Sequence, residues 1–197
     1  MGITAADVKK LRDRTGLGMM DCKRALEEAD GDIAKAEELL RKKGLKAAEL
    51  RSTRTAAEGL VGHYVHMNGK IGVLVELNCE TDFVARNEAF AQLLKDLCMQ
   101  VAATNPAYLA PEDVPEEDLE RERGILTDQF KDKPEHVREK IAEGKLKDYY
   151  KQVCLVEQPF IKDTAQSVQQ RITEAAAKLG EKIAIGRFVR FEVGEEA

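Results

Sequence analysis

Two carboxylates and a hydroxyl lie close together in the segment from Asn78 to Asn87. Glu80 and Asp82 flank Thr81, and two acids at this spacing could form a general acid and base pair or ligate a divalent cation. Asp also commonly accepts hydrogen bonds from backbone amides in turns, so a purely local role for Asp82 stays open. The segment is therefore a candidate site whose chemistry the acids alone do not decide.

The same segment places a large apolar pair, Phe83 and Val84, directly beside Asp82. An aromatic ring next to an acid at a polar junction is typical of a loop that contacts another protein. The alternative is a hydrophobic staple, in which the ring packs back onto the helix that follows. The pattern alone favours neither interpretation.

A thiol and two histidines could supply nucleophilic chemistry instead. Cys79 precedes the acids, and His63 and His66 lie on the strand that we expect to pair with it. A Cys–His nucleophile needs a third group that orients the base, and the sequence offers none. The apolar neighbours of Cys79 favour a packed thiol.

The chain has four cysteines and no C-x-x-C pair. We therefore expect buried thiols in a reducing compartment, and neither a zinc site nor another metal site. The four are Cys22, Cys79, Cys98 and Cys154.

No nucleotide-binding motif is evident. The phosphate loop G-x-x-x-x-G-K-[ST] does not occur. Gly16-Leu17-Gly18 begins like G-x-G-x-x-G, but Asp21 stands at the third glycine position and no strand is expected before it. We therefore expect the chain to bind no nucleotide and no cofactor directly.

The net charge of −5 argues against a protein that coats the phosphate backbone of DNA or RNA. Residues 1–54, however, hold 13 Lys and Arg against 10 Asp and Glu, a net of +3. A solvated helix face explains this excess, and an RNA contact is the alternative. No signal peptide is recognised, nor an apolar run of the roughly 20 residues that a membrane span needs, so we expect a cytoplasmic protein without membrane contact.

A hairpin and a helix would position the candidate segment. Leu60 to Met67 and Lys70 to Asn78 predict two strands, and Asn68-Gly69 between them predicts a tight turn. A helix from Asn87 to about Thr104 follows. The candidate segment would thus lie at a strand-to-helix junction.

Residues 1–44 predict a bundle of three short helices that resembles the ubiquitin-associated fold. Thr4 and Asp32 are expected helix caps, and Gly44 is expected to end the third helix. In such bundles the loop after the first helix, here Gly16-Leu17-Gly18, is a binding edge. Residues 45–58 predict a partly helical linker, and residues 59–197 a second domain.

That second domain is predicted to be antiparallel, so the fold class is α+β: the bundle, then a three-stranded sheet packed with helices. Charged helices are expected near Glu116–Phe130 and Pro134–Glu143, and Asp163 or Thr164 is expected to cap a helix that Gly180 ends. The last strand, Lys182 to Val193, alternates apolar residues. Three strands leave edges and one face uncovered, so we expect a second copy to cover them in a homodimer.

Two stretches resemble signatures of the bacterial elongation factor Ts family. Thr81 to Asn87 reads Thr-Asp-Phe-Val-Ala-Arg-Asn, which is the family's pattern intact. Arg12 to Leu26 resembles its N-terminal signature, with Leu17 where a smaller residue is common. Longer members have a duplicated core and an inserted coiled coil, and this chain is expected to lack both.

The resemblance implies a guanine-nucleotide exchange factor for elongation factor Tu, and not an enzyme, since no covalent bond is broken. The bundle would bind the partner's GTPase domain, while the segment from Thr81 to Val84 would intrude near its magnesium and phosphate site. Phe83 would wedge into an apolar pocket, and Asp82 would perturb the groups that hold Mg²⁺. A homodimer would then form a heterotetramer with elongation factor Tu. Further contacts are expected at Arg86, Asn87, Gly16, Leu17, Gly18, Met19 and Met20.

Two rival functions remain open. The mildly basic bundle could serve an RNA- or ribosome-binding module. Alternatively, the chain could be a protein-interaction adaptor of the ubiquitin-associated type, which would need only residues 1–44.

Overall fold

The computed structural model describes residues 3–66, 68–129 and 134–195. The chain divides into two compact units, each drawn from three separate stretches. The first comprises Met1–Gly59, Asn78–Phe90 and Ile172–Ala184, and the second comprises Leu60–Leu77, Ala91–Arg171 and Ile185–Ala197. The domain boundaries at residues 44 and 58 stay a prediction.

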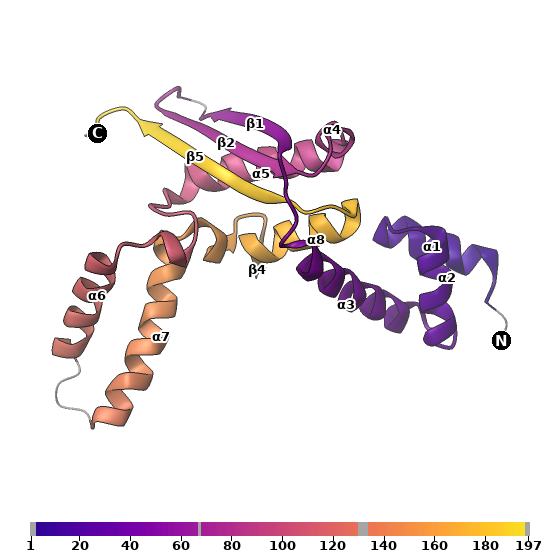
Figure 1. The fold of residues 1–197 in the computed structure, drawn as a ribbon, viewed down its shortest axis with the longest axis horizontal. Coiled ribbons are helices and arrows are strands. Elements are labelled where there is room, and N and C mark those ends of the chain that lie inside the picture. The colour runs from indigo at the N-terminus through magenta and orange to yellow at the C-terminus, as the bar shows by residue number, and fades with distance from the viewer. Residues whose placement is uncertain (1–2, 67, 130–133, 196–197) are drawn as a thin grey trace. The chain divides into compact units, whose positions relative to one another are not determined.

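The first unit begins with three helices, α1 (Ala5–Thr15), α2 (Met19–Glu28) and α3 (Ile33–Arg51) (Figure 1). The Thr4 hydroxyl accepts from the Asp7 amide at 3.2 Å, and the Asp7 carboxylate accepts from the Thr4 amide at 3.1 Å. Asp32 caps α3 by accepting from the Lys35 amide at 3.1 Å. These caps confirm the predicted helix starts. The buried core of this bundle consists of Val8, Leu11, Cys22, Ala25, Leu26, Ala29, Ala36 and Leu40.

The expected end of the third helix at Gly44 is wrong, because α3 continues to Arg51. A glycine inside a helix costs only about 1 kcal/mol relative to alanine. A Cβ at Gly44 would lie 3.1 Å from Cβ of Ala177, so this glycine lets α3 approach helix α8 (Val168–Leu179) closely. Ala48 is buried one turn further on. Packing therefore outweighs the local stop signal.

The predicted three-stranded antiparallel sheet is confirmed. Strands β1 (Glu58–Val65), β2 (Ile71–Cys79) and β5 (Ala184–Glu192) lie in the order β1-β2-β5. At the hairpin turn Gly69 has a φ of 70°, and its amide donates to the His66 carbonyl at 2.7 Å. A glycine takes this left-handed conformation without strain.

Helix α5 (Glu88–Thr104) covers one face of the sheet (Figure 1). A Cβ on Gly62 of β1 would meet the Leu94 side chain at 2.5 Å, and the Cys98 thiol bonds the backbone of Val75. In β2, Val73 and Val75 are buried on this side, while Leu74 between them is exposed. The strand therefore has one packed face and one face without cover.

The uncovered side, here called the open sheet face, carries apolar residues from all three strands. Arg187 of β5 pairs with Glu76 of β2 at 2.8 Å, which places both on the same side as Leu74. Alternation then puts further exposed apolar residues of β1 and β5 on this face, and Val193 follows directly after β5. Its apolar members are Val61, Val65, Leu74, Val189, Phe191 and Val193.

Helices α6 (Glu116–Gln129) and α7 (Glu135–Val153) lie side by side as an antiparallel hairpin (Figure 1). The two charged helices that the sequence predicts here are present, although α7 runs on to Val153 instead of ending near Glu143, and the predicted end at Phe130 lies outside the described residues. The expected lack of an inserted coiled coil stays a prediction. The hairpin base is fixed by a small apolar cluster that includes Val114, Leu119 and Cys154. The sequence therefore predicts the two helices themselves but not their pairing.

The remaining elements complete the chain. They are the short helices α4 (Asp82–Ala85), η1 (Pro111–Asp113) and η2 (Leu155–Glu157), and the paired strands β3 (Pro159–Phe160) and β4 (Asp163–Ser167). Because residues 163–167 form a strand, the expected cap at Asp163 or Thr164 is wrong, and Ser167 accepts from the Gln170 amide at 3.2 Å instead. Within the described ranges no helix combines the length and the apolar character that a membrane crossing requires.

Candidate functional site

The candidate segment folds as a short helical turn, α4, at the end of β2. Thr81 caps this turn, since its hydroxyl accepts from the Val84 amide at 3.4 Å. The Arg86 amide donates to the Asp82 carbonyl at 3.1 Å, and the Asn87 amide donates to the Val84 carbonyl at 2.9 Å. The turn is thus closed at both ends rather than being an open loop.

Two carboxylates tie the start of the turn to a distant part of the chain. The Glu181 carboxylate accepts from the Glu80 amide at 3.0 Å, the Thr81 amide at 3.0 Å and the Thr81 hydroxyl at 2.6 Å. In return, the Glu80 carboxylate accepts from the Lys182 amide at 2.7 Å and from Arg54 at 3.3 Å. All these residues belong to the first unit. We call this set of hydrogen bonds the double-glutamate clasp.

The side chains of the turn point in opposite directions. Val84 and Ala85 are buried, whereas the Phe83 ring is 83% exposed. Asp82 and Arg86 are exposed and form an ion pair at 2.7 Å, one helical turn apart. Val84 therefore anchors the turn, and Phe83, Asp82 and Arg86 are presented to solvent. Asn87 closes the segment by accepting from the Ala89 amide at 2.8 Å, at the start of α5.

The second group of predicted contact residues lies at the connection between α1 and α2. Gly16 ends α1 with a φ of 70°, Leu17 is half-buried, and Gly18 precedes the first turn of α2. Met19 and Met20 are both exposed, Met20 to 66%. This group belongs to the same unit as Phe83. Among the described residues no hydrogen bond or ion pair joins the two groups.

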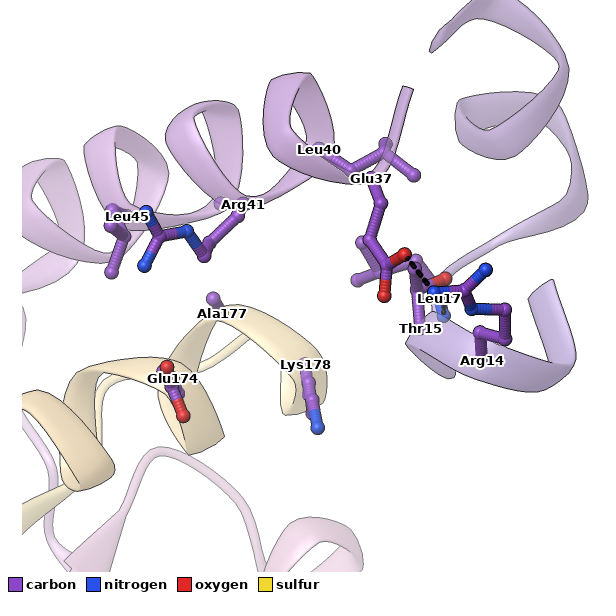
Figure 2. Close-up of a pocket in the computed structure, with 11 residues that line it drawn as sticks. Arg14, Thr15, Leu17, Glu37, Leu40, Arg41, Leu45, Glu174, Ala177 and Lys178 are labelled. Atoms are coloured by element: carbon purple, nitrogen blue, oxygen red, sulfur yellow. Dashed lines mark hydrogen bonds and ion pairs between the residues drawn. The ribbon is translucent and has the colours of Figure 1, made fainter. Parts of the chain in front are cut away.

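A cavity of about 190 Å³ lies beside this connection, between α3 and the C-terminal half of α8 (Figure 2). Arg14 and Glu37 form an ion pair at 2.7 Å in its wall, and Leu17, Leu40 and Ala177 contribute apolar surface. Its volume lies below the roughly 300–1,000 Å³ of typical small-molecule sites. The cavity therefore gives no support to a nucleotide site.

The geometry argues against the Cys–His alternative. Cys79 is fully buried, and its thiol donates to the Thr81 carbonyl at 3.2 Å. Burial, and then the nearby Glu181 carboxylate, raise the pKa of the Cys79 thiol. His63 is exposed on β1, and His66 is exposed directly after the end of that strand. A buried thiol with a raised pKa is a poor nucleophile, and the described ranges contain no group of three or more His, Cys, Asp and Glu that could hold a metal.

Thiol reactivity tests this description of the cysteines. All four are buried and free, and burial raises the pKa of Cys98 and of Cys154 to about 11. We expect an aromatic disulfide reagent to modify the folded chain far more slowly than free cysteine, and to titrate all four thiols once the chain is denatured. One thiol that reacts at the rate of free cysteine in the folded chain would contradict the burial.

The clasp should make stability depend on pH. The hydrogen bond from the Lys182 amide, helped by Arg54, holds the pKa of the Glu80 carboxyl below its ordinary value of 4.5 against the opposing effect of desolvation. A carboxylate with a lowered folded-state pKa stabilises the fold above its unfolded-state pKa, and that stabilisation is lost as pH falls through the folded-state value.

We therefore expect the free energy of unfolding at neutral pH to be higher for the parental chain than for the Glu80→Gln variant. The difference should shrink as pH falls below about 4.5. Denaturant titrations between about pH 7 and pH 3 measure it. Glu143→Gln, an exposed position on α7, is the control and should show a flat difference. A difference that grows on acidification would contradict the clasp.

The sequence predicts neither the part that Glu181 and Arg54 play in the clasp nor the hydrogen bonds that the Glu80 carboxylate accepts from Lys182 and Arg54. Glu181 lies 100 positions from Thr81, and no local pattern connects them. The sequence gives only an indirect indication of such an acceptor. The backbone amides at the end of β2 need hydrogen-bond acceptors, and because the turn buries Val84, water cannot reach all of them.

Comparisons with known proteins bear on the whole chain. The sequence model of the family described as elongation factor TS matches residues 37–195. A curated protein named elongation factor Ts from Moorella thermoacetica is 60% identical over 195 residues, covering 98% of this chain and 96% of the relative. Proteins of the same name from Thermodesulfovibrio yellowstonii and Thermotoga neapolitana are 54% and 56% identical over 196 and 189 residues. The first covers 99% of this chain and 98% of the relative, and the second covers 96% of each.

Proposed function

The chain belongs to the elongation factor Ts family, and on that basis we propose that it is the guanine-nucleotide exchange factor for elongation factor Tu. It would bind elongation factor Tu in its GDP form, disturb the magnesium and phosphate site, and release GDP so that GTP can bind. The partner's nucleotide is the only one involved, and the chain itself would contact neither DNA nor a membrane. Its place of action would be the cytoplasm, where translation elongation takes place.

The observation that carries this proposal is the exposure of Phe83. Its ring is 83% exposed although the residues on either side of the turn are hydrogen-bonded and Val84 is buried. An exposed aromatic ring on a rigid turn loses little conformational entropy when it enters a pocket. Fully burying a Phe side chain contributes about 1.5–3 kcal/mol. One ring therefore suffices to change a binding equilibrium by one to two orders of magnitude.

Exchange follows from thermodynamic linkage. In the partner, Mg²⁺ neutralises the diphosphate and holds it to the protein. A factor that binds the empty GTPase more tightly than the GDP-bound form must weaken GDP binding by the same factor. Each 1.4 kcal/mol or so of differential contact weakens GDP about tenfold. The factor itself breaks no covalent bond and needs no cofactor.

The Asp82 carboxylate is suited to leave its ion pair with Arg86 and contact elongation factor Tu instead. Among the residues that the structure describes, its carboxylate pairs with Arg86 alone, in an exposed ion pair spaced one helical turn apart. Such pairs contribute about 0.3–0.5 kcal/mol, so giving one up on docking costs little. Released from Arg86, the carboxylate can act on the groups that hold the partner's Mg²⁺. Val84 would contribute by anchoring the turn, and Thr81 by capping it.

The exposed methionines would supply a second contact. Met19 and Met20 protrude at the start of α2, next to the Gly16-Leu17-Gly18 connection. Methionine side chains are flexible and polarisable, and they adapt to an irregular apolar surface. We assign this region to docking on the GTPase domain, while the turn with Phe83 acts on the nucleotide site.

We propose that the open sheet face pairs with the same face of a second copy. Three strands of about 9 residues give a face of about 400 Å², and exposed apolar residues gathered on one face mark interaction surfaces. Phe191 on this face is 68% exposed. A two-fold axis would bring Phe191 and Val193 of each copy against the other's sheet. Two exchange factors would then carry two elongation factor Tu molecules in a heterotetramer.

Calorimetric titration tests the exchange function through linkage. The chain should bind nucleotide-free elongation factor Tu much more tightly than the GDP-bound form. The ratio of the two dissociation constants should equal the factor by which the chain weakens GDP. Equal affinity for the two forms would overturn the proposal, since such a ligand cannot displace GDP.

A further inference from the structure

We propose that Glu181 is a positioning residue for exchange: its carboxylate orients the Thr81 hydroxyl so that the turn holds Phe83 outward. This inference rests on the proposed exchange function and names a residue outside the segment that touches the partner. Glu181 would not meet the nucleotide site itself. It would act through Thr81, 100 positions earlier in the chain.

The single carboxylate of Glu181 accepts three hydrogen bonds. Oε2 of Glu181 accepts from both the Glu80 and Thr81 amides, and Oε1 accepts from the Thr81 hydroxyl. The Thr81 carbonyl accepts a hydrogen bond from the Cys79 thiol. Every polar group of Thr81 is therefore engaged, so this residue is fixed in both backbone and side chain.

The Thr81 hydroxyl is directed toward Glu181. A hydroxyl has one proton, and here it is donated to the Glu181 carboxylate at 2.6 Å. A lone pair of the same oxygen remains for the Val84 amide at 3.4 Å, which is the cap of α4. Glu181 therefore selects the hydroxyl orientation in which Thr81 can cap the turn.

The residue type at position 181 decides which hydrogen bonds can form with Thr81. A glutamate accepts at both oxygens, whereas a glutamine accepts at one and donates from the other. In Glu181→Gln the amide oxygen can still bond the two backbone amides. Its NH₂ group, however, would face the Thr81 oxygen as a donor, so the hydroxyl proton would lose its acceptor and the hydroxyl would no longer be oriented by residue 181. The substitution therefore removes the orienting bond while preserving size.

The clasp also holds Glu181 itself in place. The neighbouring Lys182 amide donates to Glu80 at 2.7 Å, and the Lys182 ammonium donates to the Arg54 carbonyl at 2.8 Å. Three remote stretches of the first unit thus meet at the base of the turn. A contact group that is held rigid before docking gives up less entropy on docking, which is the physical value of such positioning.

The release of fluorescent GDP from elongation factor Tu, measured over a range of exchange-factor concentrations, tests this role. Glu181→Gln should lower the maximal release rate about tenfold, equivalent to about 1.4 kcal/mol. The half-saturating concentration should change less than about threefold, because docking through the other surfaces is intact. Glu174→Gln, a half-buried glutamate on α8, is the matched control and should behave like the parental chain.

A double-mutant cycle separates positioning from general damage. If Glu181 acts through the ring, adding Glu181→Gln to Phe83→Ala should lower the maximal rate less than about twofold further. A fully multiplicative loss would overturn the inference, and so would a Glu181→Gln chain whose maximal rate equals that of the parental chain. A parental chain that does not accelerate release would instead overturn the exchange function itself.

Hydrogen exchange in the chain without partner provides a readout that does not depend on activity. The Glu80 and Thr81 amides should exchange slowly in the parental chain, and the Val84 amide should exchange faster in Glu181→Gln as its cap weakens. The helix amides of α1 and α2 should be unchanged. Unaltered exchange at Val84 would overturn the orienting role.

Discussion

Replacing Phe83 by alanine should slow stimulated GDP release by about 10- to 100-fold, because burying the ring contributes about 1.5–3 kcal/mol to the docked state. The thermal stability of the chain should stay close to the parental value, since the ring is 83% exposed and packs on little. Stopped-flow fluorescence of labelled GDP measures the first quantity, and calorimetry of the chain alone measures the second.

Two control variants sharpen this experiment. Leu50→Ala removes another exposed large apolar side chain of the first unit and should leave release unchanged. Phe90→Ala, by contrast, removes a fully buried ring and should lower the free energy of unfolding by about 3–5 kcal/mol. A Phe83→Ala chain that unfolds like Phe90→Ala, or that stimulates release at the parental rate, would remove the basis for assigning the ring to partner contact.

A charge at the centre of the open sheet face should separate the proposed homodimer. Leu74 lies on the middle strand and is 47% exposed. The nearest charged residue along β2 is Glu76, two positions further on. In Leu74→Glu a two-fold interface would have to bury two added carboxylates, each of them beside Glu76 of its own strand. We expect the dimer dissociation constant to rise at least about 100-fold, equivalent to about 2.7 kcal/mol.

Sedimentation equilibrium of the parental chain and the variant measures this change. Because Leu74 is already half-exposed, the fold should tolerate the substitution, and circular dichroism should be unaltered. Ile125→Glu, an exposed position on α6, is the control and should remain dimeric. A parental chain that is monomeric at every concentration would show that the open sheet face has another occupant or none.

The sequence predicted the elements whose signals are local. The Thr4 cap, the Asp32 cap and the Asn68-Gly69 turn each need only neighbouring residues, and each is present. The antiparallel sheet followed from alternation in its three strands. These features are encoded within about ten residues, and there local propensity and the final fold agree.

The errors arose where packing between distant segments decides the structure. Gly44 is a helix stop by propensity, but α3 passes through it because α8 packs closely there. The pairing of α6 with α7 depends on a small cluster at their base rather than on a strong apolar stripe. A single sequence does not encode such partners in any local pattern.

The candidate site shows the same division. The segment from Thr81 to Val84 stood out by composition, yet the sequence left open whether Phe83 packs inward or outward. The structure answers this through Val84, which is buried and turns the ring away. Glu181, which lies 100 residues away, was not predictable because nothing near it indicates its partner.

The release of labelled GDP from preloaded elongation factor Tu tests the central claim most directly. Excess unlabelled GDP is added with and without this chain at a fixed Mg²⁺ concentration. We predict that release accelerates with chain concentration until it saturates, and that the parental chain reaches a far higher plateau than Phe83→Ala. A release rate that does not change when the folded parental chain is added would contradict the account.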